Sequence, residues 1–118
     1  MSIILHITKR SQWEEAQKAG RYEAETLRSQ GFIHCSKPDQ VVAVANFLFR
    51  NQTDLVLLCI DPDKVVPQIR YENLEGGEKL FPHVYGPLNL DAVATVCRFE
   101  PGPDGTFALP QSLSHNAD

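Results

Sequence analysis

Three of the four histidines in the chain precede a hydroxyl side chain by two residues. The pairs are His6 with Thr8, His34 with Ser36, and His83 with Tyr85. Each pair lies in a segment of strand-like composition, and residues two apart on a strand point to the same face. Burying a polar side chain on an apolar strand costs free energy unless the side chain is hydrogen-bonded. This predicts that the three pairs share one polar pocket. The alternative is that each histidine covers a strand face or binds a main-chain carbonyl.

Acid–base chemistry at a small ligand is the first function that these residue types suit. A histidine titrates near neutral pH, with an unperturbed pKa of about 6.5, and can exchange a proton with a ribose or a phosphate. A carboxylate can stabilise a developing cation, and a tyrosine can stack on an aromatic ring. The predicted catalytic residues are Glu72, His83 and His34, and the predicted ligand-binding residues are His6, Thr8, Ser36 and Tyr85. For Glu72 the alternative is a solvated strand residue paired with Arg70 or Lys79.

Metal chemistry is a further alternative, because three neutral imidazoles and a water make a catalytic zinc sphere. His6, His34 and His83 could supply the imidazoles and Glu72 the base. Their spacing matches no known zinc signature, so no metal site is predicted. The pair Gly76–Gly77 does not make a phosphate-binding loop, and the chain contains no G-x-S-x-G motif.

The three cysteines, Cys35, Cys59 and Cys97, each lie in an apolar run, and none forms a C-x-x-C pair. They are predicted to be small buried hydrophobic residues in a reducing compartment. A catalytic thiol at Cys35, between His34 and Ser36, is the alternative.

The elements that must position these residues follow from periodicity and turn signals. Strands are predicted over residues 3–8, 31–36, 54–60, 67–72, 81–88 and 94–100. A helix over residues 10–19 has Ser11 and Glu14 at capping-box spacing and Gly20 as its stop. A second helix is predicted from Lys37 to about residue 50, with Ser36 as its N-cap and an apolar face of Val41, Val44, Ala45, Leu48, Phe47 and Phe49. Residues 21–30 are predicted to be a loop that can contain one turn of helix, and residues 75–78 a turn.

Length and order predict one α+β domain over residues 1–110 and a flexible tail over 111–118. The sheet is predicted to be mixed and twisted, with two main helices packed on it. The net charge of −4 provides no basic stripe for nucleic acid. The longest apolar stretch, Leu55 to Ile60, is too short to cross a membrane, and no signal peptide is visible. A cytoplasmic location is expected, and the oligomeric state is open.

Several blocks resemble a small bacterial domain-of-unknown-function family, family nine-five-two. They are residues 5–8, Trp13, 20–22, 31–36, 70–72, 76–77 and 81–88, and the resemblance extends from residue 3 to about 110. The resemblance implies an ADP-ribosyltransferase-like fold and a ligand such as NAD. It assigns His6 to the first-strand position that holds the ribose, and residues 34–36 to the second strand of the site. The third position, a glutamate, is absent from the strand with His83 and Tyr85, which leaves Glu72 as its candidate substitute.

On this resemblance the chain binds NAD or a related nucleotide. His6 and His34 would hold ribose or phosphate, and Tyr85 would stack on the base or nicotinamide. Glu72 would stabilise charge at the ribose carbon, with His83 as acid or base. The alternatives are a non-catalytic binding module, a metal-dependent hydrolase and a structural or interaction domain.

Overall fold

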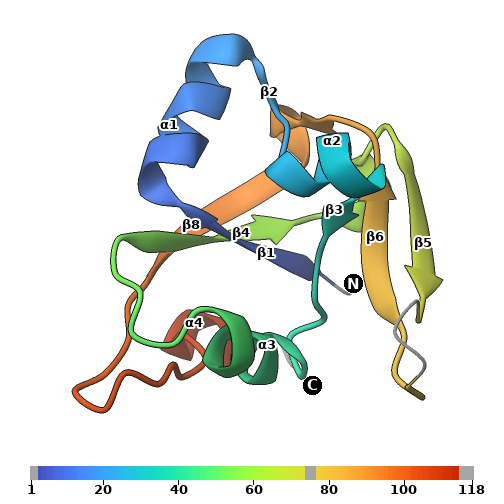
Figure 1. The fold of residues 1–118 in the computed structure, drawn as a ribbon. Helices are drawn as coiled ribbons and strands as arrows, with labels where there is room; N and C mark the ends of the chain where they lie inside the picture. The colour runs from blue at the N-terminus through green and yellow to red at the C-terminus, as the bar shows by residue number, and fades with distance from the viewer. Residues whose placement is uncertain (1–2, 74–76, 115–118) are drawn as a thin grey trace.

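The computed structural model describes residues 3–73 and 77–114, and its strands form three small antiparallel sheets (Figure 1). The first sheet has the order β1-β4-β8, formed by β1 (Ile4–Lys9), β4 (Leu55–Ile60) and β8 (Val93–Phe99). The second has the order β3-β6-β5, formed by β3 (Ile33–His34), β6 (Phe81–Tyr85) and β5 (Gln68–Glu72). A two-stranded sheet pairs β2 (Arg21–Tyr22) with β7 (Leu88–Asn89).

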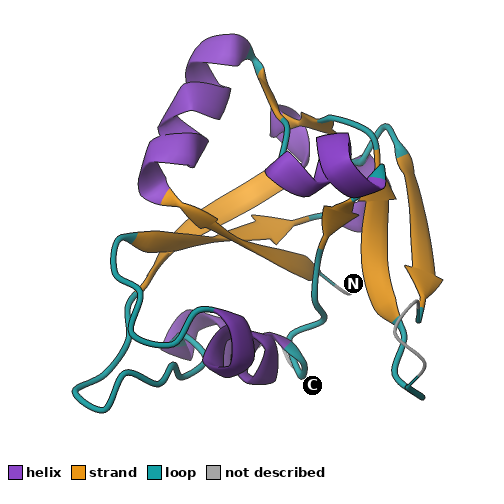
Figure 2. Cartoon of the chain, viewed as in Figure 1, coloured by secondary structure: helices purple, strands orange, loops and turns teal. Residues whose placement is uncertain are grey.

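The α+β class is confirmed, whereas the expected mixed sheet is wrong. Every strand pairing among the described residues is antiparallel. The helices are α1 (Arg10–Ala19), α2 (Glu25–Gln30), α3 (Val41–Leu48) and α4 (Gln111–Ser114), with 3-10 turns η1 (Pro62–Lys64) and η2 (Leu90–Ala92). The helices lie on two sides of the first sheet, with α1 and α2 on one side and α3 and α4 on the other (Figure 2).

Among the described residues, one isolated bridge joins the first two sheets. The N–H of Leu5 donates to the carbonyl of Ser36 at 2.7 Å, and the N–H of Ser36 donates back to Leu5 at 2.8 Å. The chain leaving β3 therefore runs beside β1 before it enters α3. This contact decides which side chains of the two strands share a face.

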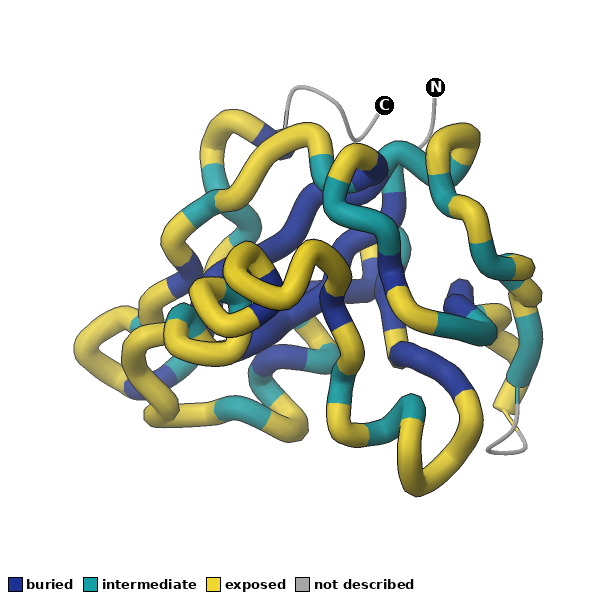
Figure 3. The backbone as a smooth tube through the Cα atoms, turned by 90° about the horizontal axis from the view of Figure 1, so that it is seen from above, coloured by how far each residue is buried: buried dark blue, intermediate teal, exposed yellow. Residues whose placement is uncertain are grey.

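Strand β4 is buried on both faces, because each face carries its own apolar cluster. Val56, Leu58 and Ile60 pack with Ile4 and with the part of α1 around Ala16. The alternate residues of β4 pack with α3, Phe99, Phe107 and Leu113 of α4. Figure 3 shows the buried stretches of backbone running through the middle of the molecule. The prediction that residues 54–60 form the most buried strand agrees with this arrangement.

Helix α1 has the predicted bounds, although its predicted capping box is wrong. The N-cap is Lys9, which makes no side-chain capping bond, and Ser11 lies inside the first turn. The predicted stop at Gly20 is confirmed. Its φ of 86° is left-handed, and its N–H donates to the carbonyl of Ala16. Glycine adopts this conformation without the steric cost that other residues bear.

The second predicted helix is shorter than expected. A turn in which Gln40 and Val41 donate to the carbonyl of Lys37 precedes α3, so the helix starts at Val41. Ser36 is not its N-cap, because its main chain pairs with Leu5. Of the predicted apolar face, Val41 and Ala45 are buried and Phe47 is 85% exposed.

The two segments of weakest pattern contain more structure than expected. Residues 21–30, predicted to be a loop that can contain one turn of helix, form α2 and also the unexpected strand β2. The predicted tail starts at Gln111, yet residues 111–114 form α4 and Leu113 is buried. The rest of that tail, including His115, and residues 75–76 of the predicted turn at 75–78 lie outside the described residues. No helix in the described ranges has the length and apolar character needed to span a membrane.

Candidate functional site

The three histidine strands are neighbours, but their side chains divide between two sites. Because Leu5 lies opposite Ser36 in an antiparallel bridge, His6 comes opposite Cys35 and shares its face. His34 is adjacent to Cys35 in sequence and points to the other face. The apolar clusters agree with this assignment, because Cys35 packs with Ile4 and Val84, on the face that His6 shares. The expected single pocket is therefore wrong.

His6 lies at the centre of a buried polar network between α1 and the sheets. Its Nδ1 donates to the main-chain carbonyl of His34 at 2.6 Å, and its Nε2 lies 2.7 Å from the hydroxyl of Tyr22. That hydroxyl is 2.9 Å from Oγ1 of Thr8, which also contacts Gln12 at 2.9 Å. Burial lowers the pKa of His6 to about 4 and raises the pKa of Tyr22 to about 12. These values describe uncharged groups that satisfy one another inside the fold.

A ligand-binding role for His6, Thr8 and Ser36 stays a prediction that their burial does not favour. Their exposed fractions are 8%, 3% and 5%. His6 and Thr8 are bonded to partners within the protein, and the main chain of Ser36 is taken up by the bridge to Leu5. A ligand would have to displace these contacts to reach the three side chains.

The second site is built on the β5–β6 pair. Its register places Arg70 opposite His83, Gln68 opposite Tyr85, and Glu72 opposite Phe81, so these side chains share one face. The carboxylate Oε1 of Glu72 accepts hydrogen bonds from Nδ1 of His83, at 3.0 Å, and from the hydroxyl of Tyr85. Three predicted site residues therefore meet at one oxygen atom.

Shared hydrogen bonding sets the charge of this group. The bond from Tyr85, and next that from His83, lowers the pKa of Glu72 below its ordinary value. The same contact raises the pKa of Tyr85. Glu72 is thus a carboxylate at neutral pH, and Tyr85 keeps its proton. The guanidinium of Arg70 lies over the Tyr85 ring, 4.7 Å from its centroid, and adds positive charge to the face.

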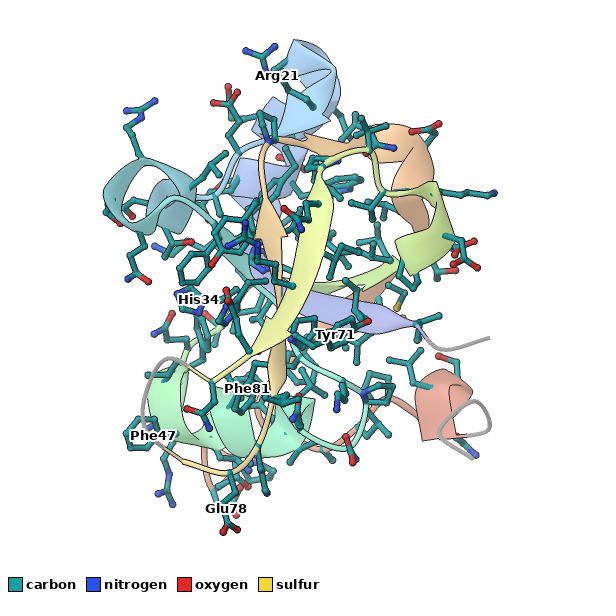
Figure 4. All side chains as sticks on the ribbon, turned by 90° about the vertical axis from the view of Figure 1, so that its right-hand side faces the viewer. Arg21, His34, Phe47, Tyr71, Glu78 and Phe81 are labelled. Carbon is teal, nitrogen blue, oxygen red and sulfur yellow. The ribbon has the colours of Figure 1, made fainter. Side chains whose placement is uncertain are left out.

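Phe32 and His34 complete the site from the β3 side. Phe32 stacks on His83 with ring centroids 4.2 Å apart, and the His34 ring lies 5.3 Å from that of His83. Nε2 of His34 is 2.8 Å from Oε1 of Gln30 in α2. In Figure 4, His34 and Tyr71 lie on either side of β5, which shows that Tyr71 belongs to the opposite face. We call the surface formed by Phe32, His34, Arg70, Glu72, His83 and Tyr85 the histidine face.

The imidazole of His83 is fixed at Nδ1 and almost fully enclosed by its neighbours. Its side chain is 5% exposed, and among the described residues its hydrogen bond runs from Nδ1 to Glu72. No buried side-chain nitrogen or oxygen in those residues lacks a hydrogen-bond partner, so Nε2 keeps a small exposed area in a ring that is otherwise enclosed. A ring anchored at Nδ1 by a carboxylate presents Nε2 for proton exchange with a ligand.

Phe32, Arg70 and Gln30 are members of this site that the sequence prediction missed. Phe32 is two residues from His34, and Arg70 is two residues from Glu72, so the same strand spacing could have found both. No local signal indicated Gln30, because residues 21–30 show no clear hydrophobic period. Arg70 had been considered only as a salt-bridge partner for Glu72.

The geometry argues against the two remaining chemical alternatives, a metal site and a catalytic thiol at Cys35. Within the described ranges no three His, Cys, Asp or Glu side chains are grouped so that they could hold a metal ion. His6 faces away from the other two histidines, which removes the expected ligand set. Cys35 is buried and its pKa is raised to about 12 by burial, so its thiol does not ionise near neutral pH.

Fold and site define a small antiparallel α+β domain with a glutamate-anchored histidine on one sheet face. The chain belongs to the family described as "Protein of unknown function (DUF952)", whose model matches residues 7–96. This finding confirms the expected domain-of-unknown-function family. No curated protein matches the chain.

Solved structures of one related protein, CC0527 from Caulobacter crescentus, are similar over nearly the whole chain. Its crystal structure is 32% identical, covers 95% of this chain and 98% of the other, and has a TM-score of 0.86. Its solution NMR structure, also 32% identical, covers 96% and 95% with a TM-score of 0.79. Neither the family description nor these structures supports the ADP-ribosyltransferase-like grouping or an NAD ligand.

Proposed function

We propose that the histidine face binds a small ligand that carries an anionic group and an aromatic ring, a class that includes nucleotides such as NAD. The observation that carries this proposal is the fixed ring of His83, held at Nδ1 by Glu72 on the same face as the exposed Arg70. The exposed Arg70 supplies donors for an anion, and Tyr85 supplies an aromatic surface.

Binding is better supported than ADP-ribosyl transfer. Transfer would need a carboxylate directed at the ribose carbon, whereas Oε1 of Glu72 accepts from both Tyr85 and His83. Those bonds keep the carboxylate ionised, but they use its oxygen to position the side chains of Tyr85 and His83. A non-catalytic binding module is therefore favoured over an ADP-ribosyl-transferring enzyme. It differs from the enzyme in producing no nicotinamide from NAD.

The test is a titration of isotope-labelled protein with NAD, with AMP and nicotinamide run in parallel. Binding at this face predicts saturable amide shifts at His34, Glu72, His83 and Tyr85. Tyr85→Phe should weaken binding by up to about tenfold, because it removes a hydrogen bond worth about 1.4 kcal/mol that helps Glu72 hold the ring of His83. Tyr71→Phe is the matched control, since Tyr71 lies on the opposite face of the same strand pair.

Each outcome has a defined meaning. Shifts confined to these residues, with Tyr71→Phe behaving as the wild type, support the proposal. The proposal is rejected if millimolar ligand causes no shift. It is also rejected if Tyr85→Phe and Tyr71→Phe bind the ligand equally well. Nicotinamide release in the presence of NAD would then separate the enzyme from the binding module.

A further inference from the structure

Two cysteines meet across strands β4 and β8, far from the histidine face along the sheet order. The sulfur atoms of Cys59 and Cys97 are 3.9 Å apart. Leu57 lies opposite Cys97 and Cys59 opposite Thr95, so the two cysteines are diagonal neighbours on one face. Cys59 is 3% exposed, whereas Cys97 is half-buried on a strand that pairs only with β4 among the described residues.

We propose that Cys59 and Cys97 form an oxidation site, which a hydroperoxide converts into a disulfide between β4 and β8. The proposal is independent of the ligand proposed for the histidine face. It identifies a modification site in a pair of residues that packing alone would treat as small hydrophobic side chains.

The chemistry takes place in two balanced steps. The thiolate of Cys97 attacks one peroxide oxygen, the O–O bond breaks, and the sulfur is oxidised to a sulfenic acid while water or an alcohol leaves. The sulfur of Cys59 then attacks the sulfur of Cys97 and expels the hydroxyl as water, which also takes up the Cys59 proton. Two electrons pass from the thiols to the peroxide, and one S–S bond forms.

Accessibility decides the order of the two cysteines. Cys97 can be reached from solvent, whereas Cys59 is enclosed and burial raises its pKa to about 12. Cys59 therefore serves as the resolving thiol and not as the first nucleophile. The sulfurs must approach from 3.9 Å to about 2.0 Å, and because diagonal strand neighbours have Cα atoms about 7–8 Å apart, the bond also requires a small backbone movement of β8 toward β4.

Movement of Cys97 would also be felt by α4. Its sulfur lies 4.0 Å from the hydroxyl oxygen of Ser112, so a sulfur drawn toward Cys59 leaves that contact. Cys35 provides an internal control. It is buried in the other apolar cluster, on the opposite face of the fold from Cys59.

The experiment treats the native full-length chain with hydrogen peroxide, blocks free thiols under denaturing conditions, and maps the tryptic peptides. Each cysteine falls in a separate peptide: residues 29–50 contain Cys35, residues 51–64 contain Cys59, and residues 80–98 contain Cys97. The expected product is peptide 51–64 joined to peptide 80–98, with the mass lower by two hydrogen atoms and restored by dithiothreitol. Cys35 should remain fully alkylated.

The peptide map of the wild-type protein is the decisive measurement, so the test does not require any variant to fold. Cys59→Ser should give a sulfenic acid at Cys97 that dimedone traps, and Cys97→Ser should leave Cys59 alkylated as in untreated protein. Three free thiols after peroxide treatment, a Cys97–Cys97 linkage between two chains, or a linkage that involves Cys35 would each overturn the proposal.

Discussion

His6 donates a hydrogen bond to the main-chain oxygen of His34, yet the two histidine side chains leave their strands on opposite faces. The distance between Nδ1 and that oxygen is 2.6 Å, so the residues are in direct contact. Contact between them nevertheless does not create one site. His6 stabilises the interior, and His34 belongs to the histidine face.

The buried His6 should make stability fall in mild acid. Its pKa is lowered from 6.5 to about 4 in the folded protein. Between those pH values the unfolded chain binds a proton that the folded protein does not, so the free energy of unfolding decreases as pH falls. The full loss is about 3 kcal/mol, at about 1.4 kcal/mol for each pKa unit.

Denaturant unfolding of wild type and His6→Gln from pH 7 to pH 4 measures this effect. The wild-type advantage should be complete above pH 6.5 and shrink steadily toward pH 4. If the two stability curves stay parallel over that range, the assignment of the neutral ring to His6 is wrong.

Replacing Glu72 should lower the raised pKa of Tyr85. The hydrogen bond to Glu72 is the largest cause of the raised pKa of Tyr85, so Glu72→Gln should lower that pKa toward its ordinary value of about 10. A titration of ring-labelled tyrosine by NMR follows each residue separately. The pKa of Tyr71 is raised mainly by burial and should not change in this variant. An unchanged Tyr85 would contradict the shared-oxygen geometry.

Phe32 should be a main support of the histidine face. It is 5% exposed and stacks on His83, and truncating a buried phenylalanine to alanine costs about 3 kcal/mol. Phe47→Ala is the matched control, because that ring is 85% exposed and its loss should stay within about 0.5 kcal/mol. Denaturant midpoints compare the two, and similar losses would show that Phe32 is not packed as described.

Helix α4 should contribute to stability through one side chain. Leu113 is 5% exposed in the cluster that includes Phe107, so Leu113→Ala should lower the free energy of unfolding by about 2 kcal/mol. Leu48, which is 59% exposed, provides the comparison variant with an expected loss of about 0.5 kcal/mol or less. Equal effects in thermal or chemical unfolding would mean that residues 111–114 do not dock on the core.

Strong local patterns in the sequence predicted the elements that they specify. Helical periodicity and Gly20 gave the bounds of α1, and the continuous apolar run gave β4. The segment over residues 21–30 lacks such a pattern. Its α2 depends on tertiary packing, with Leu27 against the core and the left-handed Gly31 at its end. Short elements of this kind are stabilised by the fold and not by propensity.

Strand spacing predicted part of the candidate site. The rest depends on which residues of neighbouring strands lie opposite one another. The alternation in β6 correctly put His83 and Tyr85 on one face. Nothing local states that Leu5 pairs with Ser36, and a shift of one residue would have moved His6 to the face of His34. The sequence could thus predict which residues share a strand face, but not which strands bring their faces together.

The bridge between Leu5 and Ser36 has a consequence for the whole molecule. With it, the strands of the two larger sheets follow one another as β5-β6-β3-β1-β4-β8, a continuous ribbon of main-chain hydrogen bonds. The histidine face occupies one end of this ribbon and the cysteine pair the other. A substitution at one end is therefore expected to leave the side-chain contacts at the other end unchanged, while the Leu5–Ser36 amides help to keep the two ends in register.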